Sequence, residues 1–455
     1  MTPACRFPAR RIAGAVATVV ALIASPAASA ADQTQPGAGI AQAMQLAHQS
    51  PLVQSAMSFL KAQARQIKDP ALRTATLDIL TNPDSCAMHR RGLGTQAAQD
   101  AVIQTLFEQG FINRADAAGV ASGVRAAIFP PVLQAESDCP RPPQPLESAP
   151  GSSYGGHHSY PGGLPVHEAN NDRSGVNLAS QYQATYGHVG HSGLPEVAAS
   201  ADAAQHAAHH GAEDHAKHAA KHGQDLPIDA DVTLAAPIWH DWAKTIVFQW
   251  NADGSEFKEF DFGGTGTLDA WGKAGDSRTG GHHILSVAEA MARGFAPLMV
   301  IAQASAHSAP TLGNEYKVVN WLRAAAIIAR LDPVKTGYLS TDAAGNLRLP
   351  ALGKLGEVDL NASGQTNLRV EYVLHNLSDA DYTFSGPAVS DVNVLLTKLA
   401  TEFGYDAADT ARYNTKLRNP ALAYLSGERL LTLYSVNGLD AVRQELKALR
   451  AKGVI

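Results

Sequence analysis

The stretch HHSYPGGLPVH at residues 157–167 carries three histidines around a Pro-Gly-Gly turn. Further along, the chain has an adjacent pair, His240-Asp241, and then Lys244. Imidazole and carboxylate together are the mixed ligands that divalent metals use when they activate water for ester hydrolysis. The segments that carry the later motifs have helical patterns, and ligands spread over several helices fit a bundle whose core opens onto a metal pocket. The sequence therefore predicts a mainly α fold, a helical bundle, around a divalent metal centre.

The order of these motifs resembles the HD superfamily of metal-dependent phosphohydrolases, which gathers His, His-Asp and Asp ligands in a helical bundle. Residues 157–167 are similar to the HHxYxGGLxxH opening of one bacterial branch, whose last histidine is a ligand, here His167. The His-Asp pair implies His240 and Asp241 as metal ligands. The family pattern HDxGK implies Lys244 as a cation near the phosphate, although alanine replaces its glycine. The resemblance covers about half of the chain, with large insertions.

The resemblance implies three more ligands and leaves two choices open. Either His282 or His283 can be the next ligand, because the family has a histidine after glycine at the start of this helix. His307 stands at the place of the following histidine. For the closing carboxylate, Asp391 is favoured because an expected helix lies ahead of it. Asp332 competes because it is closer behind His307, but a proline follows it directly and ends its helix.

An enzyme of this family would hydrolyse a small phosphorylated substrate, either a phosphodiester or a nucleotide. Water on one or two divalent metal ions, with its pKa lowered, would attack phosphorus. Asp241 would be a ligand and orient this water, and Lys244 would offset charge on the phosphoryl oxygens. The choice among Mn, Fe, Ni, Zn and Mg, the number of ions and the oligomeric state stay open.

A different class of function is a non-catalytic periplasmic protein that binds or buffers metal on a degenerate HD scaffold. Ala243 in the second motif and Pro237 just before it depart from the family pattern and favour this alternative. Residues 187–223 form a low-complexity insertion that is rich in histidine. This insertion is either an arm that loads metal or a solvated loop. Its crowded histidines are His206, His209, His210, His215, His218 and His222.

Residues 1–30 have the pattern of a signal peptide. Three arginines precede an apolar run over residues 12–23, and Ala28-Ser29-Ala30 offers small residues for cleavage. The run is short for a bilayer, so an uncleaved anchor is the less favoured alternative. We expect an exported protein of the periplasm or the medium, with no membrane span after cleavage.

The charge of the chain excludes one class of partner. The formal net charge is −6, and no run is rich in lysine or arginine. A nucleic-acid scaffold, which binds mainly by neutralising phosphates, is therefore not expected. Cys5 leaves with the signal peptide, so that Cys86 and Cys139 remain. An exported pair of cysteines favours a disulfide over a metal site, and neither has a CxxC neighbour.

The expected organisation has four parts. After the signal peptide come a helical N-terminal module over 31–129, a Pro-rich linker over 130–153 and the HD-like domain over 154–455. Inside this domain, residues 335–386 are expected to hold a β-hairpin insertion. The reason is that apolar and charged residues alternate at the start of 368–374, as in a half-buried strand that 381–384 can pair with.

Overall fold

The computed structural model describes residues 35–189, 194–195, 225–268, 274–352 and 367–455. Helices dominate these residues, and each sheet is an antiparallel pair of short strands, so the predicted mainly α fold is confirmed. The predicted signal peptide and nearly all of the His-rich insertion lie outside the described residues. Within the described part of the chain, no helix is both long and apolar enough to cross a membrane.

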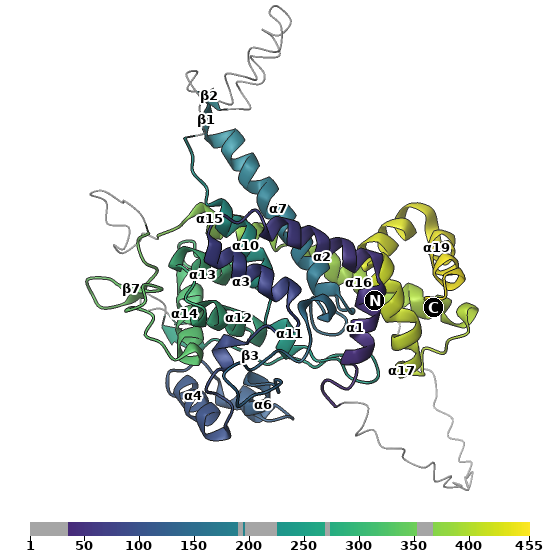
Figure 1. Ribbon diagram of the computed structural model, residues 1–455, viewed down its shortest axis with the longest axis horizontal. Helices are drawn as coiled ribbons and strands as arrows, with labels where there is room; N and C mark the ends of the chain where they lie inside the picture. The colour runs from purple at the N-terminus through teal and green to yellow at the C-terminus, as the bar shows by residue number, and fades with distance from the viewer. Residues whose placement is uncertain (1–34, 190–193, 196–224, 269–273, 353–366) are drawn as a thin grey trace, which may run out of the picture.

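The centre of the bundle is α12 (Gly281–Ala292), whose residues from Gly281 to Met291 are all buried. A helix that is buried on every face is enclosed by other elements, and α12 packs against α13 (Pro297–Ala304) and α14 (Glu315–Ala329). The helix α10 (Ala230–Trp239) packs in turn between α13 and the long α7 (Gly163–Tyr186). Figure 1 shows these helices as the green and teal part of the molecule, from which α7 projects.

The N-terminal helices cover one side of this bundle. They are α1 (Ile40–Gln49), α2 (Pro51–Ala64), α3 (Pro70–Thr81), α4 (Gln96–Glu108), α5 (Arg114–Ala118) and α6 (Val124–Ile128). Ser50 separates the first two, because its side chain accepts a hydrogen bond from the Val53 amide and caps α2. Their buried apolar side chains join the same core as those of α7, α10 and α12. The expected linker 130–153 also lies on this core, with Leu146 and Ala149 fully or almost fully buried.

A disulfide closes a loop within the N-terminal part, and a buried carboxylate of α12 fastens this part to the bundle. The predicted disulfide between Cys86 and Cys139 is confirmed, with the two Cα atoms 4.9 Å apart. Next to it, the fully buried Glu289 carboxylate accepts bonds from the Met88 and His89 amides at 3.0 and 2.9 Å. It also accepts from His89 Nδ1 at 2.8 Å and from Arg293 Nε at 2.7 Å. Burial raises the pKa of Glu289, but Arg293 and His89 outweigh it and hold this pKa at about 2.

We expect Glu289→Gln to remove part of the pH dependence of stability. A carboxyl group with a depressed folded pKa contributes stability above its unfolded pKa, and this contribution is lost as pH falls through the folded value. For Glu289 that window runs from about pH 4.5 down to about pH 2, and the contribution is about 3 kcal/mol. Urea unfolding of the wild type and of Glu289→Gln gives the two free energies of unfolding. Their difference should shrink as the pH falls across this window. A constant difference would contradict the assignment, and the exposed Glu108→Gln is the control.

The β-hairpin predicted from residues 368–374 and 381–384 is wrong. Residues 370–374 lie in α15 (Val370–Ser378), and residues 382–384 begin α16 (Tyr382–Leu399). The buried residues are 371, 372, 374, 375 and 378, which lie on one face of a helix, and this packing outweighs the short alternation. A small hairpin does exist within 335–386, where β7 (Ser340–Thr341) pairs with β8 (Leu347–Arg348). The other strands are β1 (His188–Val189), β2 (Leu194–Pro195), β3 (Asp261–Phe262), β4 (Thr265–Leu268), β5 (Ala274–Asp276) and β6 (Thr279–Gly280).

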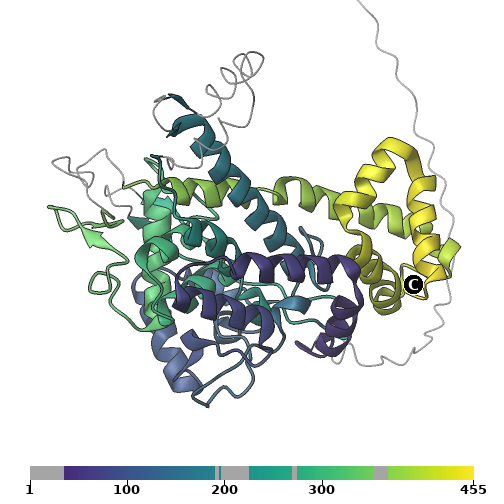
Figure 2. The same ribbon diagram turned by 45° about the horizontal axis from the view of Figure 1, so that its top comes forward.

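The C-terminal helices have a second core of their own. They are α16, η4 (Ala400–Phe403), α17 (Thr410–Tyr413), η5 (Asn414–Arg418), α18 (Asn419–Leu425) and α19 (Gly427–Ala451). Figure 2 shows most of them grouped at one end of the molecule, in yellow, beside the first helices of the chain. Tyr160 of the histidine motif is buried in this second core. The buried Arg418 also donates to the Ser159 carbonyl and hydroxyl, at 2.9 and 3.0 Å. The C-terminal helices therefore hold the histidine loop in place.

Candidate metal centre

The loop before α7 places His158 and His167 on the same side of the structure. Gly162 begins the turn into α7 with a φ of 80°. A Cβ on Gly163 would lie 1.7 Å from the His158 carbonyl oxygen, so only glycine allows the loop to fold back this closely. His167 then lies in the second turn of α7 and is 1% exposed. The Gly-Gly pair of the motif thus has a steric role.

The His240-Asp241 pair lies where α10 ends. Pro237 stands in the last turn of this helix, and its carbonyl accepts a bond from His240 Nδ1 at 2.8 Å. This bond turns Nε2 of His240 toward the interior. Because the chain leaves the helix here, Asp241 points to the same place, although neighbouring side chains diverge by about 100° on a helix. The backbone carbonyl of residue 237 therefore helps to orient a candidate ligand.

Four buried residues form the first group of candidate ligands. His167 Nε2 lies 3.1 Å from an oxygen of Asp379 and 3.4 Å from Asp241 Oδ2. His240 Nε2 lies 3.1 Å from the same Asp379 oxygen and 3.2 Å from Asp241 Oδ2. Two imidazole nitrogens and two carboxylate oxygens thus face one another at the spacing of ligands around a small cation. We call this set the first cluster.

A second cluster shares Asp241. Its other oxygen, Oδ1, lies 3.1 Å from His282 Nε2. Nitrogen atoms of His282 and His307 and an oxygen of Asp241 all lie within 4.8 Å of one another. Asp241 therefore presents one oxygen to each cluster, which is how a carboxylate bridges two ions.

The imidazoles of both clusters are oriented alike. In His240, His282 and His307 the Nδ1 atom bonds an oxygen of a neighbouring residue, which leaves Nε2 for the cluster. The partners are the Pro237 carbonyl at 2.8 Å, Glu259 at 2.6 Å and the Thr279 hydroxyl at 2.8 Å. Metal-bound histidines have such an oxygen partner almost without exception.

Several atoms in these clusters lack a hydrogen bond although they are buried. They are His240 Nε2, His282 Nε2 and Asp241 Oδ1. Buried polar atoms are normally bonded, and each exception needs an explanation. The donor set of imidazole nitrogen and carboxylate oxygen fits divalent transition metals, one of which would bind His240 Nε2 in the first cluster and another His282 Nε2 and Asp241 Oδ1 in the second.

The charges agree with this interpretation. Burial raises the pKa of Asp241, but His240 and Lys244 hold it well below its usual range. Burial lowers the pKa of His240, but Asp241 and Asp379 raise it to about 10. Without an ion, a proton on His240 therefore balances the carboxylates, and an ion that binds here must displace it. The Lys244 ammonium contacts Asp241 and the Gly151 carbonyl.

The structure brings together most of the predicted ligands, namely His167, His240, Asp241, His282 and His307. Of the two candidates at 282 and 283, His282 belongs to the second cluster. His283 instead bonds the Ala304 carbonyl at 3.1 Å and stacks on His307. The expected closing carboxylates do not reach the clusters. Asp391 is exposed on α16. Asp332 is also exposed, and its Oδ2 atom lies 3.4 Å from Lys335 Nζ.

Asp379 takes the place that was predicted for Asp391. It follows the last residue of α15 directly, so the helix sets its position. The sequence prediction missed Asp379 because it assigned this region to a hairpin turn. The sequence around it carries no signal that decides for a helix, because Glu371, His375 and Ser378 are polar and their burial is seen only in the structure. Asp381 and Glu259, which contact His167 and His282, were also missed.

No protein-family model, curated protein or solved structure matches this chain.

Proposed function

We propose that this chain is a metal-dependent hydrolase of phosphate esters, of HD type. The observation that supports it best is Asp241, a buried carboxylate with one oxygen toward each of two imidazole clusters and with Lys244 beside it. A centre that only stores metal does not need a buried ammonium, because a positive charge weakens cation binding. Next to a phosphate, however, this charge stabilises the phosphoryl oxygens.

The chain's own residues have separate roles in this proposal. His167, His240, Asp241 and Asp379 would hold one divalent ion, and Asp241, His282 and His307 a second. When bound, the ions supply a water of lowered pKa and positive charge for the phosphate. Lys244 offsets the negative charge that grows on the phosphoryl oxygens, and Asp241 keeps the ammonium in place.

We place the entrance to the site beside His157, next to the exposed Tyr382. The His157 ring lies 5.1 Å from the His167 ring and 6.2 Å from the ring of Tyr382, which is 54% exposed. A small phosphorylated substrate that enters here meets His157 before it reaches the metal ligands. The export of the protein to the periplasm or the medium remains part of the proposal, since the signal peptide lies outside the described residues.

The test is hydrolysis of a phosphomonoester, a phosphodiester and a nucleotide by the metal-free chain, with Mn, Ni, Zn or Mg added in turn. We expect turnover of at least one ester only when metal is present. Lys244→Met should lower kcat by roughly 100-fold, the effect of removing one group that stabilises transition-state charge. The exposed Lys335→Met is the matched control and should leave kcat unchanged.

The other outcome of this test favours the second class of function. A folded chain that binds metal tightly and hydrolyses none of these esters would be a metal-binding protein on a degenerate scaffold. Deletion of residues 205–222 then shows where the metal is held. A buffering protein should lose most of its metal with this segment, whereas an enzyme should keep its tightly bound ions.

A further inference from the structure

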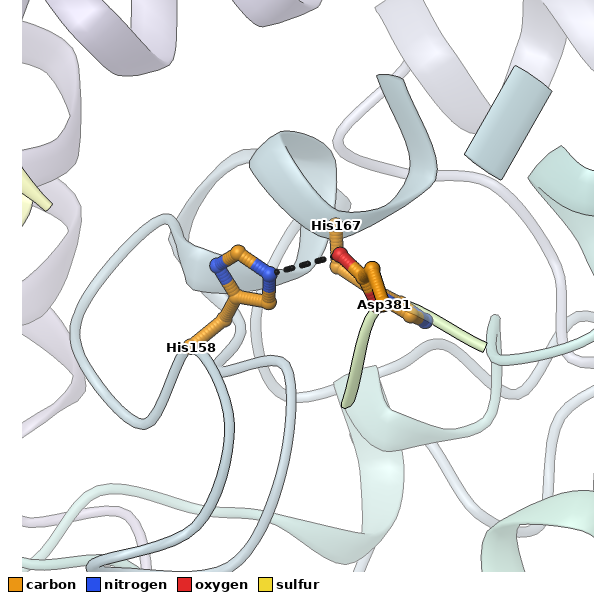
Figure 3. Close-up of side chains that lie close together, drawn as sticks. All are labelled: His158, His167 and Asp381. Carbon is orange, nitrogen blue, oxygen red and sulfur yellow. Dashed lines mark hydrogen bonds and ion pairs between the residues drawn. The ribbon is translucent and has the colours of Figure 1, made fainter. Parts of the chain in front are cut away.

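His167 also has a close neighbour on the side that faces away from the first cluster. Its Nδ1 atom lies 3.0 Å from Asp381 Oδ1. The other oxygen of Asp381 lies 3.0 Å from His158 Nε2 and accepts a bond from the Asn170 side chain at 3.1 Å. Figure 3 shows Asp381 between the two imidazoles, with the dashed line marking its contact with His158.

The protonation of His167 decides whether it can be a ligand. A neutral imidazole has one nitrogen that donates and one that accepts. Nε2 must present its lone pair to the first cluster, so the ring proton must be on Nδ1. Asp381 Oδ1 is the oxygen next to that nitrogen. The two atoms are not aligned as a hydrogen bond, yet both are buried and neither has another hydrogen-bond partner. A small rotation of the ring would align them.

We propose that Asp381 is the positioning residue for His167. It keeps the proton on Nδ1 and the ring turned toward the first cluster, and His158 holds Asp381 in this orientation. This inference rests on the proposed metal centre, but it does not depend on which ester, if any, is hydrolysed. It gives Asp381 and the histidine motif's His158 a role in metal affinity without making either of them a ligand.

His158 is itself held from several sides. Its Nε2 atom is 3.1 Å from the Ser385 hydroxyl of α16, and its Nδ1 atom is 3.2 Å from the Tyr160 hydroxyl. Glu428 of α19 lies 3.6 Å from Nδ1. Two C-terminal helices therefore contact His158, and Arg418 bonds the neighbouring Ser159 of the same loop.

A metal ion held by His158, His167 and Asp381 is the competing explanation, since their donor atoms lie within 4.8 Å of one another. The imidazole of His167 argues against it. An imidazole binds an ion at each nitrogen only after it loses its last proton, and Nε2 is already directed at the first cluster. A positioning role needs no such deprotonation.

The experiment measures zinc binding to the full chain by competition with a chromophoric chelator, together with the number of zinc ions bound at saturation. Asp381→Asn keeps the shape of the side chain but removes its charge. We expect zinc affinity at the first cluster to fall by roughly 10- to 100-fold, with the number of ions unchanged. His158→Gln should weaken binding in the same direction, but less. The exposed Asp391→Asn should bind like wild type. All variants share the histidine-rich segment, so its contribution is the same in each.

Three results would overturn this role. Wild-type affinity in a folded Asp381→Asn would show that the carboxylate does not position His167. The loss of one zinc equivalent, with the affinity of the remaining ions unchanged, would show that Asp381 is a ligand of a separate ion. An unchanged visible spectrum of the cobalt-substituted variant would exclude a reoriented His167. If the proposed function is wrong, the wild-type chain binds metal tightly but hydrolyses no ester. This result is distinct from the three results on the variants.

Discussion

Asp241→Asn should abolish hydrolysis and remove the tightly bound metal. Asp241 is the one described residue that belongs to both clusters, since Oδ2 faces His240 and Oδ1 faces His282. The amide keeps the size of the side chain but has a single acceptor and no charge. Loss of a hydrogen-bond partner of a ligand costs 10- to 100-fold in metal affinity or activity. Loss of a shared ligand should cost at least roughly 100-fold in each. Metal analysis after gel filtration and the initial rate of hydrolysis are the measurements.

This prediction needs a control for folding, because Asp241→Asn leaves the Lys244 ammonium buried without its carboxylate. Breaking a buried ion pair costs about 3–5 kcal/mol. The double variant with Asp241→Asn and Lys244→Met removes both charges, so it should be more stable than the single variant and equally inactive. Asp391→Asn and Asp332→Asn change exposed carboxylates and should keep metal and turnover. Normal turnover in Asp241→Asn would refute the shared-ligand role.

The second large effect is stabilisation by metal. A ligand that binds only the folded chain stabilises it by about 4 kcal/mol when its concentration is 1,000 times its Kd. The clusters offer buried nitrogen and oxygen atoms that lack a hydrogen bond and that an ion would bind, so Mn or Zn should raise the melting temperature by several degrees over the chain in EDTA. Because the pKa of His240 is raised to about 10 without metal, the ion must displace a proton from it. The increase should therefore be larger at pH 8 than at pH 6.

Thermal unfolding followed by circular dichroism measures this effect. In Asp241→Asn the increase in melting temperature should be much smaller, whereas Asp391→Asn should behave like wild type. An equal increase in Asp241→Asn would place the stabilising ion elsewhere in the chain. A chain whose melting temperature does not respond to any of these metals would contradict the metal centre itself.

The sequence predicts best those site residues that belong to short motifs. His167 ends the first motif, and His240 and Asp241 form the second, so their place along the chain was enough to select them. The structure brings all three together because α7 and α10 pack against each other. The choice between His282 and His283 needed the structure, since both are on α12 and a turn of 100° separates them.

Asp379 shows where sequence patterns are insufficient. A few alternating residues before it are compatible with a strand and with a helix, and only packing against α7 and α10 decides for α15. The role of Asp381 depends on contacts with residues more than 200 positions earlier in the chain. No local pattern encodes such contacts. The same holds for the C-terminal helices, whose hold on the histidine loop appears only in three dimensions.

The most direct test of the central claim is to titrate the metal-free chain with manganese while both bound metal and ester hydrolysis are followed. The proposal predicts that hydrolysis appears with the first tightly bound ions and saturates at one or two equivalents per chain. It also predicts that Asp241→Asn shows neither tight binding nor turnover. Tight binding by the wild-type chain without hydrolysis of any phosphate ester, or hydrolysis in the absence of metal, would contradict it.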